Sequence, residues 1–111
     1  MESILTSVKK MLGIAEDYEH FDTDIIMHIN STFTILTQLG VGPDMGFSIA
    51  DKHAKWSDFI GTTDVLNSVK SYMYLKVRLL FDPPLSSSVI EAMNRQISEF
   101  EFRLSVAADN E

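Results

Sequence analysis

Residues 64–84 have the sequence DVLNSVKSYMYLKVRLLFDPP, which predicts a long helix over 64–81. Apolar residues occur on almost every side of this helix, namely Val65, Leu66, Val69, Tyr72, Met73, Leu75, Val77, Leu79 and Leu80. A helix that is apolar on most faces is either central in its bundle or covered by another subunit. The run Asp82-Pro83-Pro84 ends the helix, because proline has no backbone N–H and restricts the residue before it.

Three amphipathic helices are predicted around this one, over residues 2–12, 22–39 and 87–105. In each of them apolar residues recur at i, i+3 or i+4, and i+7, which places them along one face. The sequence therefore predicts an all-α fold, a small bundle of about four helices. A length of 111 residues is typical of one domain, so residues 1–111 are expected to form a single unit.

The ends of these helices carry recognisable signals. Side-chain oxygens of Ser, Thr and Asp accept hydrogen bonds from free N–H groups at a helix start, and glycine permits the left-handed turn at a helix end. The tail 107–111 is small and acidic and is expected to fray. The predicted signals are Asp22 or Thr23 as N-cap, Ser88 with Glu91 as a capping box, and Gly13 and Gly40 as stops.

Residues 40–63 are expected to form a long ordered loop. A structureless loop of this length is uncommon in a small domain, so it should carry function or contain short elements. Phe47 and Ile49 alternate with small or polar residues, a pattern that allows a short extended piece. Residues 56–60 predict one helical turn that stops at Gly61.

Composition excludes several classes of protein. Sixteen acidic against nine basic residues give a net charge of −7, which argues against a protein that coats nucleic acid. The chain has no cysteine, which excludes disulfide scaffolds, zinc ribbons and thiol catalysis. No apolar run reaches the roughly 18–20 residues of a membrane span, and the N-terminus lacks the pattern of a signal peptide. We expect an acidic, soluble domain made in the cytoplasm.

A metal site is one interpretation of the residues around the second helix start. Asp24 and His28 are spaced i, i+4 and share a face, and His20 and Asp22 lie just upstream. Two carboxylates and two imidazoles are a possible ligand set for a divalent ion. The alternative, which we favour, is a solvated acidic helix start with surface histidines, because Asp is favoured there in any case. We therefore predict no metal and no cofactor.

No catalytic constellation stands out either. His53 lies between Lys52 and Lys55 without a Ser or Asp whose spacing would pair it. Glu99 and Glu101 are two residues apart on a helix and point to different faces. The glycines at 40–43 follow a helix, which is the wrong context for a phosphate-binding loop. We predict that the protein is not an enzyme.

Charge is unevenly distributed along the chain. Residues 1–50 carry seven acids and two bases (−5), residues 51–81 three acids and five bases (+2), and residues 82–111 six acids and two bases (−4). A basic middle between acidic flanks would let one copy's loop region meet a neighbour's acidic helix head to tail. The alternative is a mixed, solvated surface.

Three aromatic residues fall in the glycine-rich loop: Phe47, Trp56 and Phe59. The commoner outcome for such residues is to pack down on the bundle as a hydrophobic lid. The other is to anchor a contact with a partner protein, because aromatic side chains dominate interface energetics. A residue at the edge of the bundle can serve both purposes.

The ordered series of these features resembles the head–tail connector, or head-completion adaptor, proteins of long-tailed bacteriophages and prophages. The resemblance covers nearly the whole chain, and Trp56-Ser57-Asp58-Phe59 and Phe81-Asp82-Pro83-Pro84 are its most specific parts. The other matching segments are Leu12-Gly13-Ile14, Asp22-Thr23-Asp24-Ile25-Ile26, Ile35 to Gly42, Val69-Lys70-Ser71-Tyr72, Arg78-Leu79-Leu80 and Arg103-Leu104. None of these motifs is catalytic.

The resemblance implies a structural role in the virion, at the head–tail junction. Such adaptors form a ring under the portal, with about twelve copies, and closed head-to-tail contacts generate rings of this kind. The implied partners are the portal protein, a downstream connector or stopper protein, and DNA that passes through the channel without specific binding. Candidate contact residues are Phe47, Trp56, Phe59 and Arg103, within the loop 47–60 and on the last helix. The alternative function is a small acidic helical regulator or inhibitor that binds a single protein partner.

Overall fold

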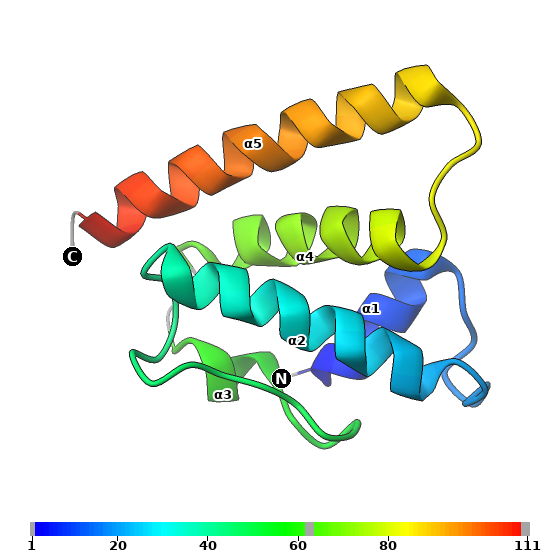
Figure 1. Ribbon diagram of the computed structural model, residues 1–111. Coiled ribbons are helices and arrows are strands. Elements are labelled where there is room, and N and C mark those ends of the chain that lie inside the picture. The colour runs from blue at the N-terminus through cyan, green and yellow to red at the C-terminus, as the bar shows by residue number, and fades with distance from the viewer. Residues whose placement is uncertain (1, 62–63, 110–111) are drawn as a thin grey trace.

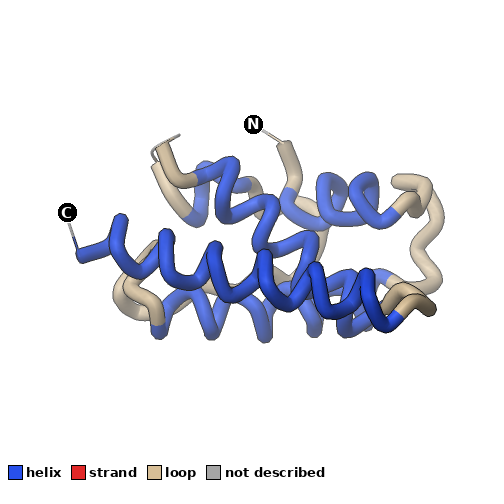
Figure 2. Tube along the Cα trace, turned by 90° about the horizontal axis from the view of Figure 1, so that it is seen from above, coloured by secondary structure: helices blue, strands red, loops and turns tan. Residues whose placement is uncertain are grey.

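The computed structural model describes residues 2–61 and 64–109, which contain five helices and no strand (Figures 1 and 2). The predicted all-α fold is thereby confirmed. Four of the helices correspond to the predicted ones, and the fifth is a single short helix within the predicted loop. The helices are α1 (Ile4–Leu12), α2 (Asp22–Gln38), α3 (Trp56–Phe59), α4 (Leu66–Phe81) and α5 (Ser87–Asp109).

Helix α4 lies in the centre of the bundle. It packs against α1 and α2 on one side and against α5 on the other, as Figure 1 shows. Val69, Met73 and Val77 are completely buried along one side of the helix, and Leu75 is buried on the opposite side. This arrangement explains why the sequence of α4 is apolar almost all round: of the two predicted alternatives, the structure shows the central helix.

The ends of α1 and α2 differ in how well they were predicted. Gly13 adopts a left-handed conformation (φ 81°) and closes α1, as its position indicated. Helix α2 begins after Phe21 without any side-chain cap, so the prediction that Asp22 or Thr23 caps it is wrong. The Asp22 carboxylate is instead engaged by Lys9 of α1, which outweighs a local cap.

Helix α5 begins at residue 87, as predicted, but ends later than predicted. The N–H of Val89 donates to Ser86 Oγ (3.4 Å), so Ser86 takes the place that was assigned to Ser88. Glu91 pairs with Arg95 rather than closing a capping box. The helix runs past residue 105 to Asp109, because its last turn is half-buried. Residues 110 and 111 of the predicted fraying tail lie outside the described residues.

The loop between α2 and α4 contains α3, which confirms the predicted helical turn at 56–60. Phe47 and Ile49 do not belong to a strand in the described part of the chain. The extended pairing of this region involves the N-terminus: Ser3 and Lys55 form an antiparallel bridge, and the N–H of Ile4 donates to the carbonyl of Ala54 (3.0 Å). The start of the chain is therefore fixed against α3.

Candidate functional site

The loop aromatics pack inward as a cluster on α2. Phe33 of α2 lies 4.9 Å from Phe47 and 4.7 Å from Phe59 between ring centroids, and Trp56 is 6.4 Å away. Trp56 and Phe59 are buried and Phe47 is half-buried. This packing favours the interpretation as a hydrophobic lid. That any of them contacts a partner stays a prediction.

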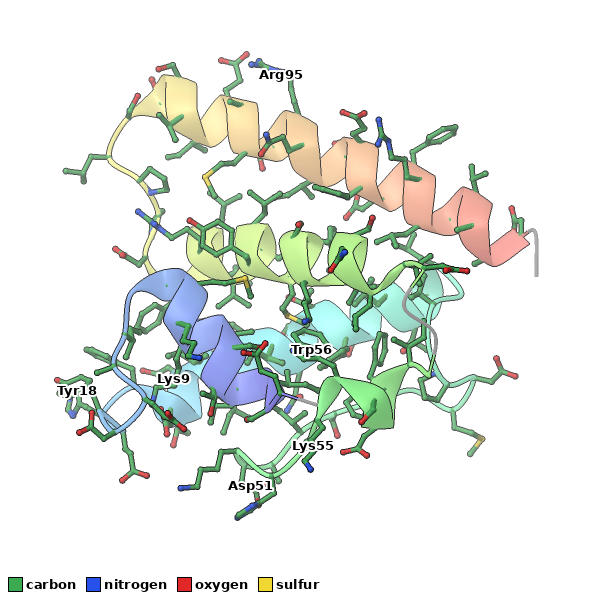
Figure 3. All side chains as sticks on the ribbon, turned by 180° about the vertical axis from the view of Figure 1, so that it is seen from behind. Lys9, Tyr18, Asp51, Lys55, Trp56 and Arg95 are labelled. Carbon is green, nitrogen blue, oxygen red and sulfur yellow. The ribbon has the colours of Figure 1, made fainter. Side chains whose placement is uncertain are left out.

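Trp56 is held by a specific polar contact as well as by packing. It lies inside the molecule (Figure 3), where its indole Nε1 donates to Ser7 Oγ of α1 at 2.8 Å. The Ser7 hydroxyl donates in turn to the carbonyl of Ile4 (3.0 Å). The Lys70 ammonium lies 5.8 Å from the centre of the indole ring, within reach of a cation–π interaction. Trp56 thus joins α3, α1 and α4.

The middle of the loop is attached to α2 by an asparagine that sequence reasoning missed. Asn30 Nδ2 donates to the carbonyl of Ile49 (2.9 Å), and the N–H of Ile49 donates to Asn30 Oδ1 (2.8 Å). The side-chain amide thereby pairs with both the N–H and the carbonyl of one residue, as a neighbouring antiparallel strand would. The available signal was a polar Asn30 next to the apolar stripe residue Ile29.

A buried lysine fixes the acidic connector between α1 and α2. The Lys9 side chain is only 2% exposed and lies 2.8 Å from Asp22 Oδ1. Its ammonium also donates to the carbonyls of Glu16 (3.0 Å) and Tyr18 (2.7 Å). These three acceptors replace the contacts with water that the Lys9 ammonium loses on burial. Nothing in the spacing of Lys9 distinguished it from exposed Lys10.

The residues considered as metal ligands make other contacts in the structure. His20 packs edge-on against the Phe21 ring (4.8 Å), and Asp22 is engaged by Lys9. No group of three or more His, Asp or Glu residues that could hold a metal ion occurs within residues 2–61 and 64–109. His53 is exposed beside Asp51, whose carboxylate accepts a hydrogen bond from the His53 backbone N–H (2.8 Å).

Helix α5 carries the remaining candidate, Arg103, on an exposed side. Arg103 pairs with Glu99, and Arg95 with Glu91 at 3.5 Å, each four residues apart. Arg95 points away from the molecule in Figure 3. Phe102 is 70% exposed, which is unusual for a large aromatic side chain. The outer side of α5 is thus a charged surface with an apolar residue available for contact.

A single polar contact joins the middle of α5 to α4. The phenol of Tyr72, completely buried, donates to Glu101 Oε2 at 2.7 Å. Burial raises the pKa of Tyr72 far above its ordinary value, and the hydrogen bond to Glu101 and its negative charge raise the pKa further. The phenol therefore remains a proton donor to Glu101.

Exposed apolar residues gather at the turn between α4 and α5. Leu80 and Val89 are each about half exposed, and Leu85 between them is fully exposed. Isolated exposed apolar residues are ordinary, but three within ten residues indicate a surface that a partner can cover. We call Leu80, Leu85 and Val89 the turn patch.

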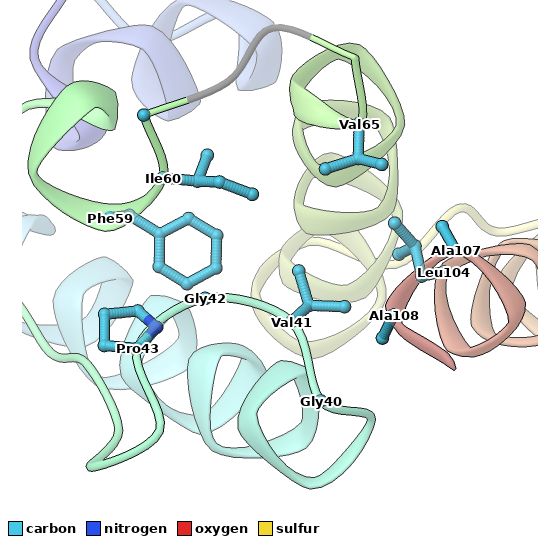
Figure 4. A pocket seen from close by; sticks show the side chains of 11 residues that line it. Gly40, Val41, Gly42, Pro43, Phe59, Ile60, Val65, Leu104, Ala107 and Ala108 are labelled. Carbon is cyan, nitrogen blue, oxygen red and sulfur yellow. The ribbon is translucent and has the colours of Figure 1, made fainter. Parts of the chain in front are cut away.

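A hollow of about 310 Å³ lies at the opposite end of α4 and α5 (Figure 4). Figure 4 shows three side chains directed into the same space: Phe59 at the end of α3, Val65 just before α4, and Leu104 of α5. Gly42, with φ +88°, allows the Phe59 ring to approach the backbone: a Cβ atom there would lie 2.3 Å from Phe59 Cε1. The side chains that line the hollow are apolar, and polar main-chain atoms also face it.

The described residues present surfaces suited to contact, namely the turn patch, Phe102 and the hollow. No helix in the described residues is long and apolar enough to cross a membrane. Comparison with curated proteins and with solved structures gave no match. The family model described as phage connector protein matches residues 4–111. Because the match covers nearly the whole chain, it includes the five helices of the described residues, the turn patch and Phe102. The chain therefore belongs to the phage connector protein family.

Proposed function

We propose that this protein is a head–tail connector that assembles as a ring under the portal, completes the DNA-filled head and joins it to the tail. The observation that carries the proposal is the match to the phage connector protein family over residues 4–111. A connector of this family is a structural component of a phage. We further propose that the ring contains about twelve copies, arranged head to tail.

The surfaces of the chain support an assembly role. The turn patch and Phe102 expose apolar area that the chain itself does not cover. The turn patch lies at one end of the α4–α5 pair and the hollow at the other, since these helices run antiparallel. Different surfaces at opposite ends of a subunit are what a heterologous, ring-closing contact requires.

The charge of the chain supports passage of DNA without binding. A net charge of −7 gives little attraction to the phosphate backbone, whereas coating DNA requires clustered Lys and Arg. A channel wall through which DNA must slide benefits from weak attraction. The partners in this proposal are the portal protein above the ring and a connector or stopper protein below it.

Deletion of the gene from the phage tests the function directly. We expect DNA-filled heads that lack tails, and restoration of infectious particles by the wild-type gene supplied in trans. Tailed particles from the deletion strain would contradict the proposal. In particles, labelled protein should lie at the head–tail junction; a label found only in host lysate, bound to one partner, would support the regulator instead.

Surface variants locate the contacts. Leu85→Ser and Phe102→Ser change exposed side chains, so we expect them to leave helicity and melting temperature nearly unchanged but to reduce particle yield. Met27→Ser is the matched control, since Met27 is also exposed but lies on α2, which carries neither the turn patch nor Phe102. An equal loss with all three variants would contradict this assignment of contacts.

A further inference from the structure

We propose that α5 is an exchangeable arm: in the assembled state, α5 of one copy packs on α4 of the next copy in place of that copy's own α5. The inference deepens the proposed function, on which it rests for its setting in a ring. The exchange itself is argued from the contacts of the chain. Its occupant is a second copy of this chain, seated through contacts that already exist within one copy.

Helix α5 is attached to the rest of the molecule on one side only. It forms the outermost layer in Figure 1 and packs chiefly on α4. Of its 23 residues, only Met93, Ile97 and Leu104 are buried. The Tyr72–Glu101 hydrogen bond is the polar contact that holds its middle. A long helix held by so few groups is the part of a structure that opens most readily.

The remainder of the chain is locked by contacts that do not involve α5. Trp56 bonds to Ser7, Lys9 engages Asp22, and Asn30 pairs with Ile49. These contacts join α1, α2, α3 and the long loop to one another. The body formed by residues 2–81 therefore keeps its own bonds when α5 leaves its seat on α4.

The segment between α4 and α5 is suited to act as a hinge. Residues 82–86 are not helical, and Pro83 and Pro84 have no N–H group to bind them to the body. Leu85 is fully exposed. Two consecutive prolines favour an extended backbone, which carries α5 away from α4 once the helix is released. Short hinges of this kind promote exchange of an element between copies.

Helix α5 also has features that stabilise it as a separate helix. Its length exceeds the roughly 12–15 residues below which isolated helices are marginal. The pairs Glu91–Arg95 and Glu99–Arg103, each with the acid first, are in the favourable i, i+4 orientation. The arm can therefore move from one α4 to another without unfolding.

Exchange of α5 accounts for the exposed turn patch. In one closed copy Leu80, Leu85 and Val89 surround the hinge and remain exposed. When α5 extends to a neighbour, these residues lie where two copies meet, so that both bodies can cover them. A chain of such exchanges that returns to its first copy closes a ring.

Two single-cysteine variants test the exchange, because the natural chain has no cysteine. Tyr72→Cys protein and Glu101→Cys protein are mixed at high concentration and treated with a short bis-maleimide. We expect a covalent heterodimer that is several times more abundant than the homodimers of either variant alone. Mixed Ser3→Cys and Lys55→Cys proteins are the control, since Ser3 and Lys55 pair within the body and should give no enrichment.

A second measurement avoids any change in the core. Four Gly or Ser residues inserted after Leu85 in the otherwise natural chain relax the hinge, so we expect fewer multimers by light scattering at equal concentration. Absence of heterodimer enrichment, or multimers unaffected by the insertion, overturns the exchange. Head completion by the gene in phage is scored separately: its success without enrichment rejects only the exchange, and its failure with enrichment rejects only the connector function.

Discussion

Asn30 and Ile49 are joined by two reciprocal hydrogen bonds, of 2.9 and 2.8 Å, between the Asn30 side-chain amide and the backbone carbonyl and N–H of Ile49. They attach the middle of the long loop to α2, and Ile49 is buried in the core there. We predict that Asn30→Ala costs about 2 kcal/mol of unfolding free energy, because the Ile49 N–H and carbonyl lose their partners.

Urea denaturation followed by circular dichroism measures this cost. Asn30→Asp keeps the acceptor for the Ile49 N–H but loses the donor to the Ile49 carbonyl. Its urea midpoint should therefore lie between those of the wild type and Asn30→Ala. Ser31→Ala, at an exposed neighbouring position, should have almost no effect. If Asn30→Ala behaves like Ser31→Ala, the bonds do not hold the loop.

Lys9 stabilises the connector through its charge and its three acceptors. We predict that Lys9→Met costs about 3 kcal/mol, near the lower end for breaking a buried ion pair, because Asp22 keeps some contact with water. Lys10→Met is the matched control. Lys10 is exposed and its ammonium lies as far as 3.9 Å from the Glu2 carboxylate, so the loss of unfolding free energy should stay below about 0.5 kcal/mol. Chemical denaturation distinguishes the two, and equal losses would refute a special role of Lys9.

Substitution of Trp56 is expected to lower the stability of the single chain, and to affect assembly only as a consequence. Trp56→Ala should cost about 4 kcal/mol, because it empties the space of the largest completely buried side chain. Trp56→Phe, which loses the bond to Ser7, should cost about 2 kcal/mol.

A double-mutant cycle isolates the contribution of that bond. Ser7→Ala leaves the indole N–H unpaired, so combining Ser7→Ala with Trp56→Phe should cost clearly less than the sum of the single losses. Additive losses would show that the bond contributes nothing beyond packing.

Tyr72 makes stability depend on alkaline pH. Its pKa is raised in the folded protein by burial and by Glu101, so the folded state retains the proton when the unfolded chain has released it. This contribution is complete below the unfolded pKa of about 10 and is lost as pH rises from there toward the higher folded pKa. The urea midpoint of the wild type should therefore fall between pH 9 and pH 11, conditions chosen at about one unit on either side of that pKa.

Tyr72→Phe provides the comparison. It should be less stable than the wild type at neutral pH by about 1 kcal/mol, through loss of the Glu101 bond, and should lose less stability on going to high pH. Tyr18→Phe, at an exposed position, should follow the wild-type profile. Identical profiles for Tyr72→Phe and the wild type would contradict the proposed titration.

Local signals predicted the helices well because they depend on neighbours in the sequence. The apolar periodicity of residues 66–81 and the stop at Asp82 are recovered in α4, and Gly13 closes α1 as expected. Predictions failed where a side chain paired with a group other than the backbone N–H expected of it, either on another helix or one turn along the same helix. Asp22 left the N-cap for Lys9, and Glu91 paired with Arg95 instead of closing a capping box.

The candidate contact residues show the same division. Sequence reasoning identified Trp56 and Phe59 as important aromatic residues of the loop, and the structure places both in the core. It could not identify Leu85 and Phe102 as the exposed apolar residues, because their exposure depends on which side of α5 and of the hinge faces α4. Phe47 and Arg103 keep exposed area, and their contact role stays a prediction.

Side-chain pattern and composition predicted an all-α chain, one helix that is apolar on most sides, stops at glycine and proline, and an acidic, cysteine-free composition. Those properties follow from side-chain spacing and backbone restrictions within a few residues. The folded arrangement was needed to show that Lys9 is buried, that Asn30 holds Ile49, and that Trp56 bonds to Ser7 across 49 residues of sequence. Burial and hydrogen bonding of this kind depend on which elements meet, and helical periodicity carries no information about that.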